Sequence, residues 1–156
     1  MNTTAEAGAR LGTAAALVRL SHLVQHVFAD VSRDHGLTPQ QTHLLCLLVD
    51  GPLGMTELRR LLNLERSGVS GLVDRVERRA LIARRPDPAD RRACRIALTD
   101  QGARLAEEAH QDVIARLETL LEEVRPADRT LMTAVVTQLL ARDGAETGRP
   151  WLSHER

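Results

Sequence analysis

Apolar residues recur at steps of three and four positions over most of this chain, the spacing that predicts amphipathic helices. The first such segment spans residues 11–35 and ends before Gly36, a residue that suits the left-handed end of a helix. Thr38 and Pro39 then form a typical helix start, and the segment after them is apolar on nearly every side. The chain is therefore expected to open with an amphipathic helix followed by a buried one.

The middle of the chain predicts two short helices and a β-hairpin. Residues 55–79 contain two helical segments separated by a tight turn, and the apolar residues of the second segment recur at the spacing of one buried face. Residues 81–98 alternate in polarity on both sides of a charged loop, as expected for two antiparallel strands. Residues 99–142 then return to helical spacing, with Thr99 and Pro126 as the starts of two further helices.

This order of elements is that of a winged helix-turn-helix with long helices added at both ends. We therefore predict a mainly α fold of the α+β winged-helix class, with six helices and a two-stranded β-wing. The apolar stripes of the terminal helices exceed what the small central unit can cover, so these helices are expected to pair with those of a second chain. The predicted division is a flexible tail at 1–10, an N-terminal dimerisation helix at 11–35, a winged helix-turn-helix domain at 36–98 (helix-turn-helix about 55–79, wing about 81–98), C-terminal dimerisation helices at 99–142 and a tail at 143–156.

The composition of the 156 residues, 43% apolar and 27% charged, is that of one globular domain rather than a disordered chain. No apolar run approaches the ~20 residues that a membrane-spanning helix needs. The first ten residues also lack the apolar segment of a secretory signal. We therefore expect a cytoplasmic protein with no membrane partner, in which both cysteines are free thiols.

Charge is distributed unevenly, although the formal net charge is zero. Between Glu57 and Arg95 the chain has eleven arginines and six acidic residues, an excess of five positive charges, and the remaining segments carry the opposite excess. A basic segment flanked by acidic ones is typical of a module that binds a polyanion. Single-stranded nucleic acid needs aromatic platforms for its bases. Because Phe28 and Trp151 are the only large aromatic residues, double-stranded DNA is the expected partner.

The second helix of the predicted helix-turn-helix has the surface that a duplex reader requires. Its outer face carries small residues and arginines, so the helix can lie close to the floor of a major groove, although an exposed helix of a soluble protein is the plainer interpretation of this segment alone. The hairpin loop has no evident structural need for its four arginines. Their guanidinium groups are well placed to pair with phosphates or to enter a minor groove. Asp90 is expected to orient a neighbouring arginine through a bidentate pair. The predicted DNA-contacting residues are Arg66, Ser67, Gly68, Ser70, Gly71, Asp74 and Arg75 on the helix, and Arg84, Arg85, Asp90, Arg91 and Arg92 on the wing.

The stretch from residue 55 to residue 102 resembles the MarR family of bacterial transcription regulators. The matching residues are the helical segment 69–75 (VSGLVDR), Asp90-Arg91-Arg92 in the wing, and Leu98-Thr99 followed by Gly102. The resemblance implies a homodimeric, cytoplasmic, ligand-responsive regulator, commonly a repressor, that binds pseudo-palindromic duplex DNA. It further implies a recognition helix in the major groove, a wing in the minor groove, and a small-molecule effector bound between the dimerisation helices and the DNA-binding domain.

The chain departs from the family pattern at two positions. Arg59 stands where the family usually has a small residue facing inward, and Ala80 stands where it usually has a glycine that ends the recognition helix. Neither change excludes the fold, but the packing of residues 56–62 is not fixed by the family pattern.

Five residues of the helices are candidates for contact with the effector. Some family members sense zinc with histidine and acidic ligands in these helices, but this chain has a histidine pair at positions i and i+4 on its first helix only, so we predict no metal site and no cofactor. A redox sensor needs an accessible thiolate, whereas Cys46 lies on an almost wholly apolar helix where burial would raise its pKa. The predicted ligand-binding residues are His22, His26, His43, Cys46 and His110, and the alternative for the histidines is that they are ordinary surface and interface residues.

Other functions of the same fold remain open at this point. The chain could be a metal- or redox-responsive sensor, or a winged-helix protein-interaction module that no longer binds DNA. An interaction module would tolerate the loss of the wing arginines, which this chain has kept. An enzyme is not predicted, because the sequence has no glycine-rich phosphate loop and no ordered set of nucleophile, base and acid.

Overall fold

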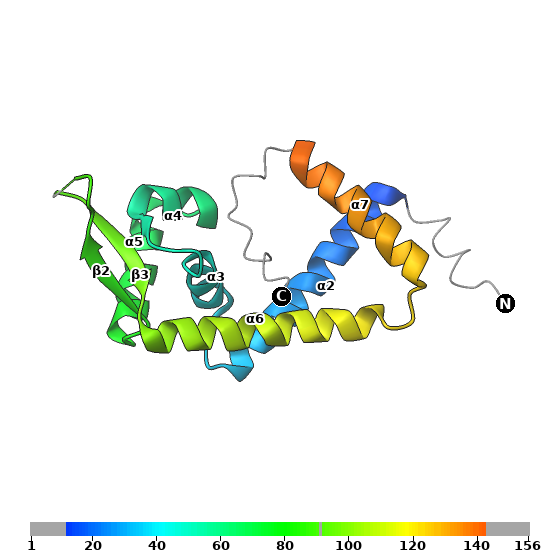
Figure 1. Cartoon of the computed structure of the whole chain (residues 1–156), viewed down its shortest axis with the longest axis horizontal. Helices are drawn as coiled ribbons and strands as arrows, with labels where there is room; N and C mark the ends of the chain where they lie inside the picture. The colour runs from blue at the N-terminus through cyan, green and yellow to red at the C-terminus, as the bar shows by residue number, and fades with distance from the viewer. Residues whose placement is uncertain (1–11, 91, 143–156) are drawn as a thin grey trace.

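The computed structural model describes residues 12–90 and 92–142, and within them the predicted mainly α winged-helix fold is confirmed. The predicted tails and Arg91 lie outside the described residues. Two long helices cross at one end of the molecule, and the hairpin projects from the other end (Figure 1). The elements are α2 (Thr13–Asp34), α3 (Pro39–Leu47), β1 (Leu53–Gly54), α4 (Met55–Leu62), α5 (Arg66–Arg78), β2 (Ile82–Pro86), β3 (Cys94–Leu98), α6 (Asp100–Leu121) and α7 (Pro126–Arg142).

The sheet has three antiparallel strands in the order β1-β3-β2 rather than the two that the sequence predicted. Strands β2 and β3 form the hairpin, in register from Ile82 opposite Leu98 to Pro86 opposite Cys94. Strand β1 adds only two residues, with Leu53 opposite Ile96. Two residues are too few to show an alternating pattern, which is why this strand could not be predicted.

One hydrophobic core joins α3, α4, α5, the sheet and the first turns of α6. Helix α3 lies in its centre, and the apolar character of that helix on nearly every side is explained by this position. The four residues that were predicted to anchor α5 are each at most 1% exposed: Val69, Leu72, Val73 and Val76.

The turn between α2 and α3 is fixed by local hydrogen bonds of the predicted type. Gly36 has a φ of +65°, and the Leu37 N–H donates to the Ser32 carbonyl at 2.8 Å, so α2 ends in a left-handed cap. Thr38 and Gln41 then cap α3 reciprocally, each side chain accepting from the other residue's backbone N–H.

A second junction connects β3 and α6 to the end of α5. The Thr99 N–H donates to the Leu81 carbonyl at 3.1 Å, and the Thr99 hydroxyl donates to the Ala80 carbonyl at 2.7 Å and accepts from the Gly102 N–H at 3.0 Å. A Cβ on Gly102 would lie 1.8 Å from the Leu81 carbonyl oxygen. The Leu-Thr-x-x-Gly pattern of the sequence is therefore a site of direct backbone-to-backbone packing.

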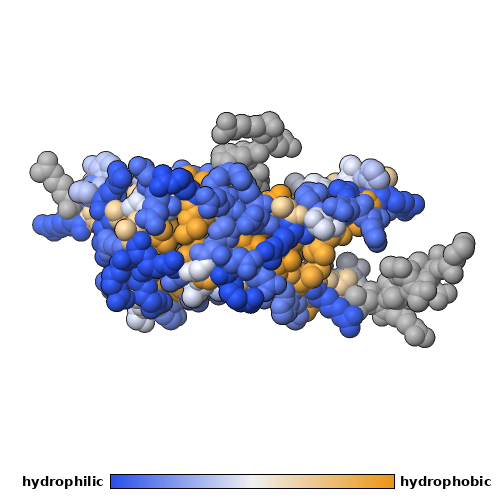
Figure 2. All heavy atoms as spheres, turned by 90° about the horizontal axis from the view of Figure 1, so that it is seen from below, coloured by the Kyte–Doolittle hydropathy of each residue, from blue (hydrophilic) through white to orange (hydrophobic). Residues whose placement is uncertain are grey.

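The long helices are far less covered than the winged part. A small cluster around Val31 and Val113 holds α2 against α6, and His35 Nε2 lies 2.7 Å from Asp112 Oδ2 beside it. No residue of α7 is buried. Apolar side chains, coloured orange, reach the surface between polar ones (Figure 2). The large exposed apolar residues are Leu17, Val18, Leu20, Leu23 and Val24 on α2, Leu120 on α6, and Leu131, Met132, Val135, Val136, Leu139 and Leu140 on α7.

None of the described helices combines the length and the apolar character that a bilayer crossing requires.

Candidate nucleic-acid interface

The outer face of α5 is open to solvent along its length. Ser67 and Gly68 are exposed near its first turn, and Ser70 and Gly71 are half-buried one turn later. Arg66 is the first residue of the helix, and the preceding Glu65 side chain makes no capping hydrogen bond. The first N–H groups of α5 therefore have no side-chain cap, and this end of a helix favours anions.

Gly71 has a role that its place in the sequence did not reveal. A Cβ on Gly71 would lie 3.2 Å from an Nη atom of Arg75, so the absent side chain leaves room for that guanidinium to lie back along the helix. A Cβ on Gly68 would meet only the Leu64 side chain at 3.7 Å, an ordinary contact. The fold itself would tolerate a Cβ at Gly68, and at Gly71 the flexible end of the Arg75 side chain would have to shift by a few tenths of an ångström.

Arg84 binds the recognition helix rather than projecting from the wing. Its Nη2 donates to Asp74 Oδ1 at 2.6 Å, and its other terminal nitrogen contacts the Glu77 carboxylate. The hydrogen bond to Asp74 raises the pKa of the Arg84 guanidinium, which is therefore charged throughout. The expectation that the wing arginines have no structural role is wrong for Arg84, because β2 passes close enough to α5 for an ion pair across the two elements.

The tip of the wing is organised by Asp87, which holds an arginine in the way that the sequence predicted for Asp90. Pairing of Asp90 with its neighbour Arg91 stays a prediction, because Arg91 lies outside the described residues. Asp87 Oδ2 accepts from Arg95 Nε at 2.9 Å, and its other oxygen accepts from the Ala89 N–H at 2.8 Å. The bond to Arg95 lowers the pKa of the Asp87 carboxyl. Asp90 instead accepts from the backbone N–H of Arg92 at 2.9 Å, an arrangement that closes a turn.

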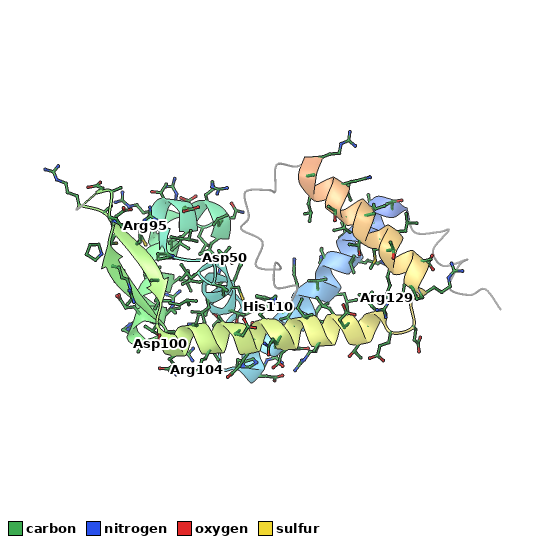
Figure 3. All side chains as sticks on the ribbon, in the orientation of Figure 1. Asp50, Arg95, Asp100, Arg104, His110 and Arg129 are labelled. Atoms are coloured by element: carbon green, nitrogen blue, oxygen red, sulfur yellow. The ribbon has the colours of Figure 1, made fainter. Side chains whose placement is uncertain are left out.

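Arg95 was missed by sequence reasoning, although it lies beside α4 at the start of the returning strand (Figure 3). Arg95 could have been found from its position on the predicted returning strand, because an antiparallel hairpin brings that strand back toward Asp87. Pairing with Asp87 neutralises the Arg95 charge, whereas Arg85 and Arg92 are exposed and form no ion pair with any residue that the structure describes.

A cleft of about 350 Å³ opens between α4 and α5. Arg59 is exposed on its α4 side, so it does not take the inward position that the family pattern gives to a small residue. Sequence reasoning missed the cleft, since it depends on the angle between two helices. Its lining residues are Met55, Thr56, Arg59, Arg66, Val69 and Ser70.

The residues predicted to contact an effector lie on three helices. His22 and His26 are exposed on α2, and His110 is half-buried on α6 where that helix passes α3 (Figure 3). His43 packs edge-on against Phe28 with ring centroids 6.5 Å apart, and partial burial lowers the pKa of its imidazole.

Cys46 is a buried residue of α3 with only 2% of its surface exposed, and this burial raises the pKa of the thiol to about 11. Within residues 12–90 and 92–142, no three His, Cys, Asp or Glu side chains converge on a position that could hold a metal ion.

A helix-turn-helix with an arginine-bearing hairpin beside its second helix defines a winged helix-turn-helix transcription regulator. Residues 35–93 match the model of the MarR family. The chain is 31% identical over 135 residues to the HTH-type transcriptional repressor MdtR of Bacillus subtilis, covering 84% of each protein. This chain belongs to the MarR family and is a MarR-type transcriptional regulator.

Other relatives agree with this membership. The HTH-type transcriptional repressor NicR of Pseudomonas putida is 36% identical over 80 residues, which is 51% of each chain. The repressor CouR bound to a 23-mer DNA duplex is 28% identical with a TM-score of 0.68, covering 81% of this chain and 91% of that one. CouR from Rhodococcus jostii RHA1 has also been solved with p-coumaroyl-CoA, at 25% identity, a TM-score of 0.69 and coverage of 82% and 91%.

Proposed function

We propose that this protein is a ligand-responsive repressor that binds pseudo-palindromic duplex DNA as a homodimer. The observation that carries the proposal is the juxtaposition of the open face of α5 with a wing whose Arg85 and Arg92 have no described acidic partner. Uncompensated guanidiniums beside a helix of small residues suit the phosphates and groove edges of a duplex. The CouR complex with a 23-mer duplex supports the same use of this fold.

The polar residues of the interface divide into contacting and positioning roles. We assign Ser67, Gly68, Ser70 and Gly71 to close approach in the major groove, Arg66 and Arg75 to its phosphates, and Arg85 and Arg92 to the minor groove beside the wing. Arg91, which lies outside the described residues, remains a minor-groove candidate from the sequence. Arg84 and Asp74 hold the wing against the recognition helix, and Asp90 shapes the wing turn.

The homodimer follows from the exposed apolar helices. Helix α7 has 17 residues, buries none of them in the single chain and exposes six large apolar side chains. An isolated helix of that length is marginal in water without tertiary packing. The corresponding helices of a second copy are the simplest cover, and a two-fold dimer would place two α5 helices about 34 Å apart, in successive major grooves.

The effector is proposed to bind where the long helices meet the winged part, as a small molecule of unidentified structure. The complex of CouR with p-coumaroyl-CoA supports a small organic ligand. Polar groups on the helices around this region are offered by four histidines, His22, His26, His43 and His110. Cys46 is buried and has almost no surface with which to contact a ligand. The raised pKa of the Cys46 thiol does not favour a redox sensor.

The test is binding to labelled duplexes taken from the DNA that flanks the protein's own gene, followed by fluorescence anisotropy. Arg85→Ala combined with Arg92→Ala should weaken binding at least about 100-fold, because each minor-groove guanidinium contributes roughly 1–3 kcal/mol. Arg125→Ala removes a charge at the opposite end of α6, in an exposed pair with Asp128, and should leave affinity unchanged. Equal affinity of the wing variant and the wild type would contradict the assignment of the wing.

A further inference from the structure

We infer that the cleft between α4 and α5 holds one phosphodiester of the DNA backbone, with Arg59 as the contact from the α4 side. This inference rests on the proposed binding of duplex DNA. The cleft brings two guanidiniums together from two helices, Arg59 on α4 and Arg66 on α5. Thr56 and Ser70 add a hydroxyl group from each helix, so the lining supplies charge and hydrogen-bond donors to one position.

The charge of the cleft is not compensated within the described residues. No acidic residue lines it, and neither Arg59 nor Arg66 forms an ion pair with any part of the chain that the structure describes. Two guanidiniums facing one cleft repel each other, and an anion between them converts that repulsion into two attractions. Glu65 is exposed next to Arg66 but is not among the residues that line the cleft.

A neighbouring cleft shows the opposite arrangement. It lies between α4 and the wing, is lined by Arg60 and Arg95, and shares Thr56 and Arg59 with the first cleft. Both Glu57 and Asp87 line it as well, and Asp87 already pairs with Arg95 at 2.9 Å. Of these two clefts, only the one between α4 and α5 presents arginines without carboxylates.

The first turn of α5 adds a second attraction for an anion. Arg66, which lines the cleft, begins a helix of 13 residues whose N-cap side chain makes no capping bond, so the first backbone N–H groups of that helix have no side-chain partner at the N-cap. The exposed surface continues directly to Ser67 and Gly68, which are the proposed groove contacts. An anion held here would therefore be continuous with a duplex on α5.

A polymer phosphate suits this cleft better than a free small anion. The two guanidiniums are exposed, and single ion pairs in water contribute only about 0–1 kcal/mol. Duplex DNA gains additional affinity from the release of its condensed counterions, which a free anion does not have.

The test is the salt dependence of binding to a duplex of arbitrary sequence. Arg59→Ala should lower the slope of log K against log salt by about one per protomer without changing base preference. Arg60→Ala is the matched control, because it removes the same charge from the next residue of α4 at the carboxylate-lined cleft, and its slope should change by clearly less. Each variant is first compared with the wild type in melting temperature and oligomeric state, so that only folded protein is scored.

The outcomes separate this inference from the function on which it rests. A wild-type protein that ignores every duplex at low salt contradicts the proposed function itself. A wild-type protein that binds, with an unchanged slope for Arg59→Ala or an equal loss for Arg60→Ala, overturns the phosphodiester site alone. A changed base preference would make Arg59 a base-reading residue and overturn it as well. Saturable binding of inorganic phosphate without DNA, lost in Arg59→Ala, would reassign the cleft to a free anion.

Discussion

The winged part buries most of its apolar side chains within the chain, whereas the long helices leave most of theirs exposed. In the winged part, fifteen buried side chains from α3, α4, α5, the sheet, α6 and the turns between them form one continuous core. In the helical part, α2 and α6 share a small cluster, and α7 buries nothing. The first region is folded by its own contacts, whereas the second exposes apolar side chains that contacts within the chain leave uncovered. The winged part therefore supplies the stability of the single chain, and the long helices are the region that the proposed dimer would bury.

The largest expected effect comes from placing charge on the exposed apolar face of α7. Val135→Glu combined with Leu139→Glu should weaken dimerisation at least about 100-fold, because each apolar side chain loses roughly 1.5–3 kcal/mol of burial and each carboxylate must be desolvated. Both residues are 46% exposed in the single chain, so the fold of the chain itself does not need them. Sedimentation equilibrium measures the change in association.

A matched double variant makes this experiment specific. Gln40→Glu with Gln101→Glu adds the same two charges at exposed positions in the first turns of α3 and α6, in the winged part. It should leave the dimer intact. A dimer that survives the α7 variant would mean that α7 is covered by something other than a second copy.

The next effect sharpens the comparison at the junction where the two parts meet. Gly102→Ala would force a Cβ to within 1.8 Å of the Leu81 carbonyl oxygen, and neither backbone can yield easily. We expect a loss of about 3 kcal/mol or more in the free energy of unfolding, measured in urea. Gly68→Ala is the control, since Gly68 is also the third residue of its helix and would meet only Leu64 at 3.7 Å.

Gly68→Ala should leave stability unchanged or raise it by up to about 1 kcal/mol, the helix preference of alanine over glycine. Equal stability of the two alanine variants would show that α6 can move away from the winged part at little cost, and the junction would then not be rigid.

The fold was largely predictable because its helices carry strong periodicity. The inner stripe of α5 and the caps at Gly36 and Thr38 depend on residues close together in the sequence, and local spacing is sufficient for such features. Strand β1 could not be predicted, because its existence depends on pairing with β3, more than forty residues later. The same holds for Gly102, whose necessity is visible only once Leu81 lies against it.

The candidate site was less predictable than the fold because charge pairs form across elements. The sequence showed that the wing is rich in arginine. It could not show that Arg84 pairs with acidic residues of α5 while Arg85 has no such partner among the described residues. Nor could it distinguish Asp87 from Asp90, since which carboxylate reaches Arg95 depends on the exact form of the wing turn. Arg59 was noted only as a departure from the family pattern, because the cleft that it lines depends on the angle between two helices.

A smaller effect concerns strain within the well-packed part. Ala80 has a φ of +56°, a left-handed conformation that costs a residue with a Cβ roughly 1–2 kcal/mol. Ala80→Gly should therefore raise the free energy of unfolding by about 1 kcal/mol. Ala103→Gly, at an exposed position within α6, should lower it by about the same amount. Destabilisation by both substitutions would show that the end of α5 stores no backbone strain.

The last prediction concerns the reactivity of the two thiols, which differ in burial. Cys46 is 2% exposed with a thiol pKa raised to about 11, whereas Cys94 is half-buried on the wing. At pH 8 we expect a thiol reagent to modify Cys94 in the folded protein and Cys46 only after unfolding, with Cys94→Ala removing the fast phase.

The raised pKa of Cys46 also fixes the sign of a pH effect on stability. The folded state keeps its proton at pH values where the unfolded thiol has lost it, so the contribution of Cys46 is complete below about pH 9 and is lost as pH rises through about 11. Cys46→Ala should flatten this part of the stability profile, and Cys94→Ala should not. Cys46 is buried on α3, the helix that carries the core residues Leu44 and Leu45. Rapid modification of Cys46 in the folded protein would therefore mean that the surroundings of α3 open readily, and the winged part would not be the more stable of the two regions.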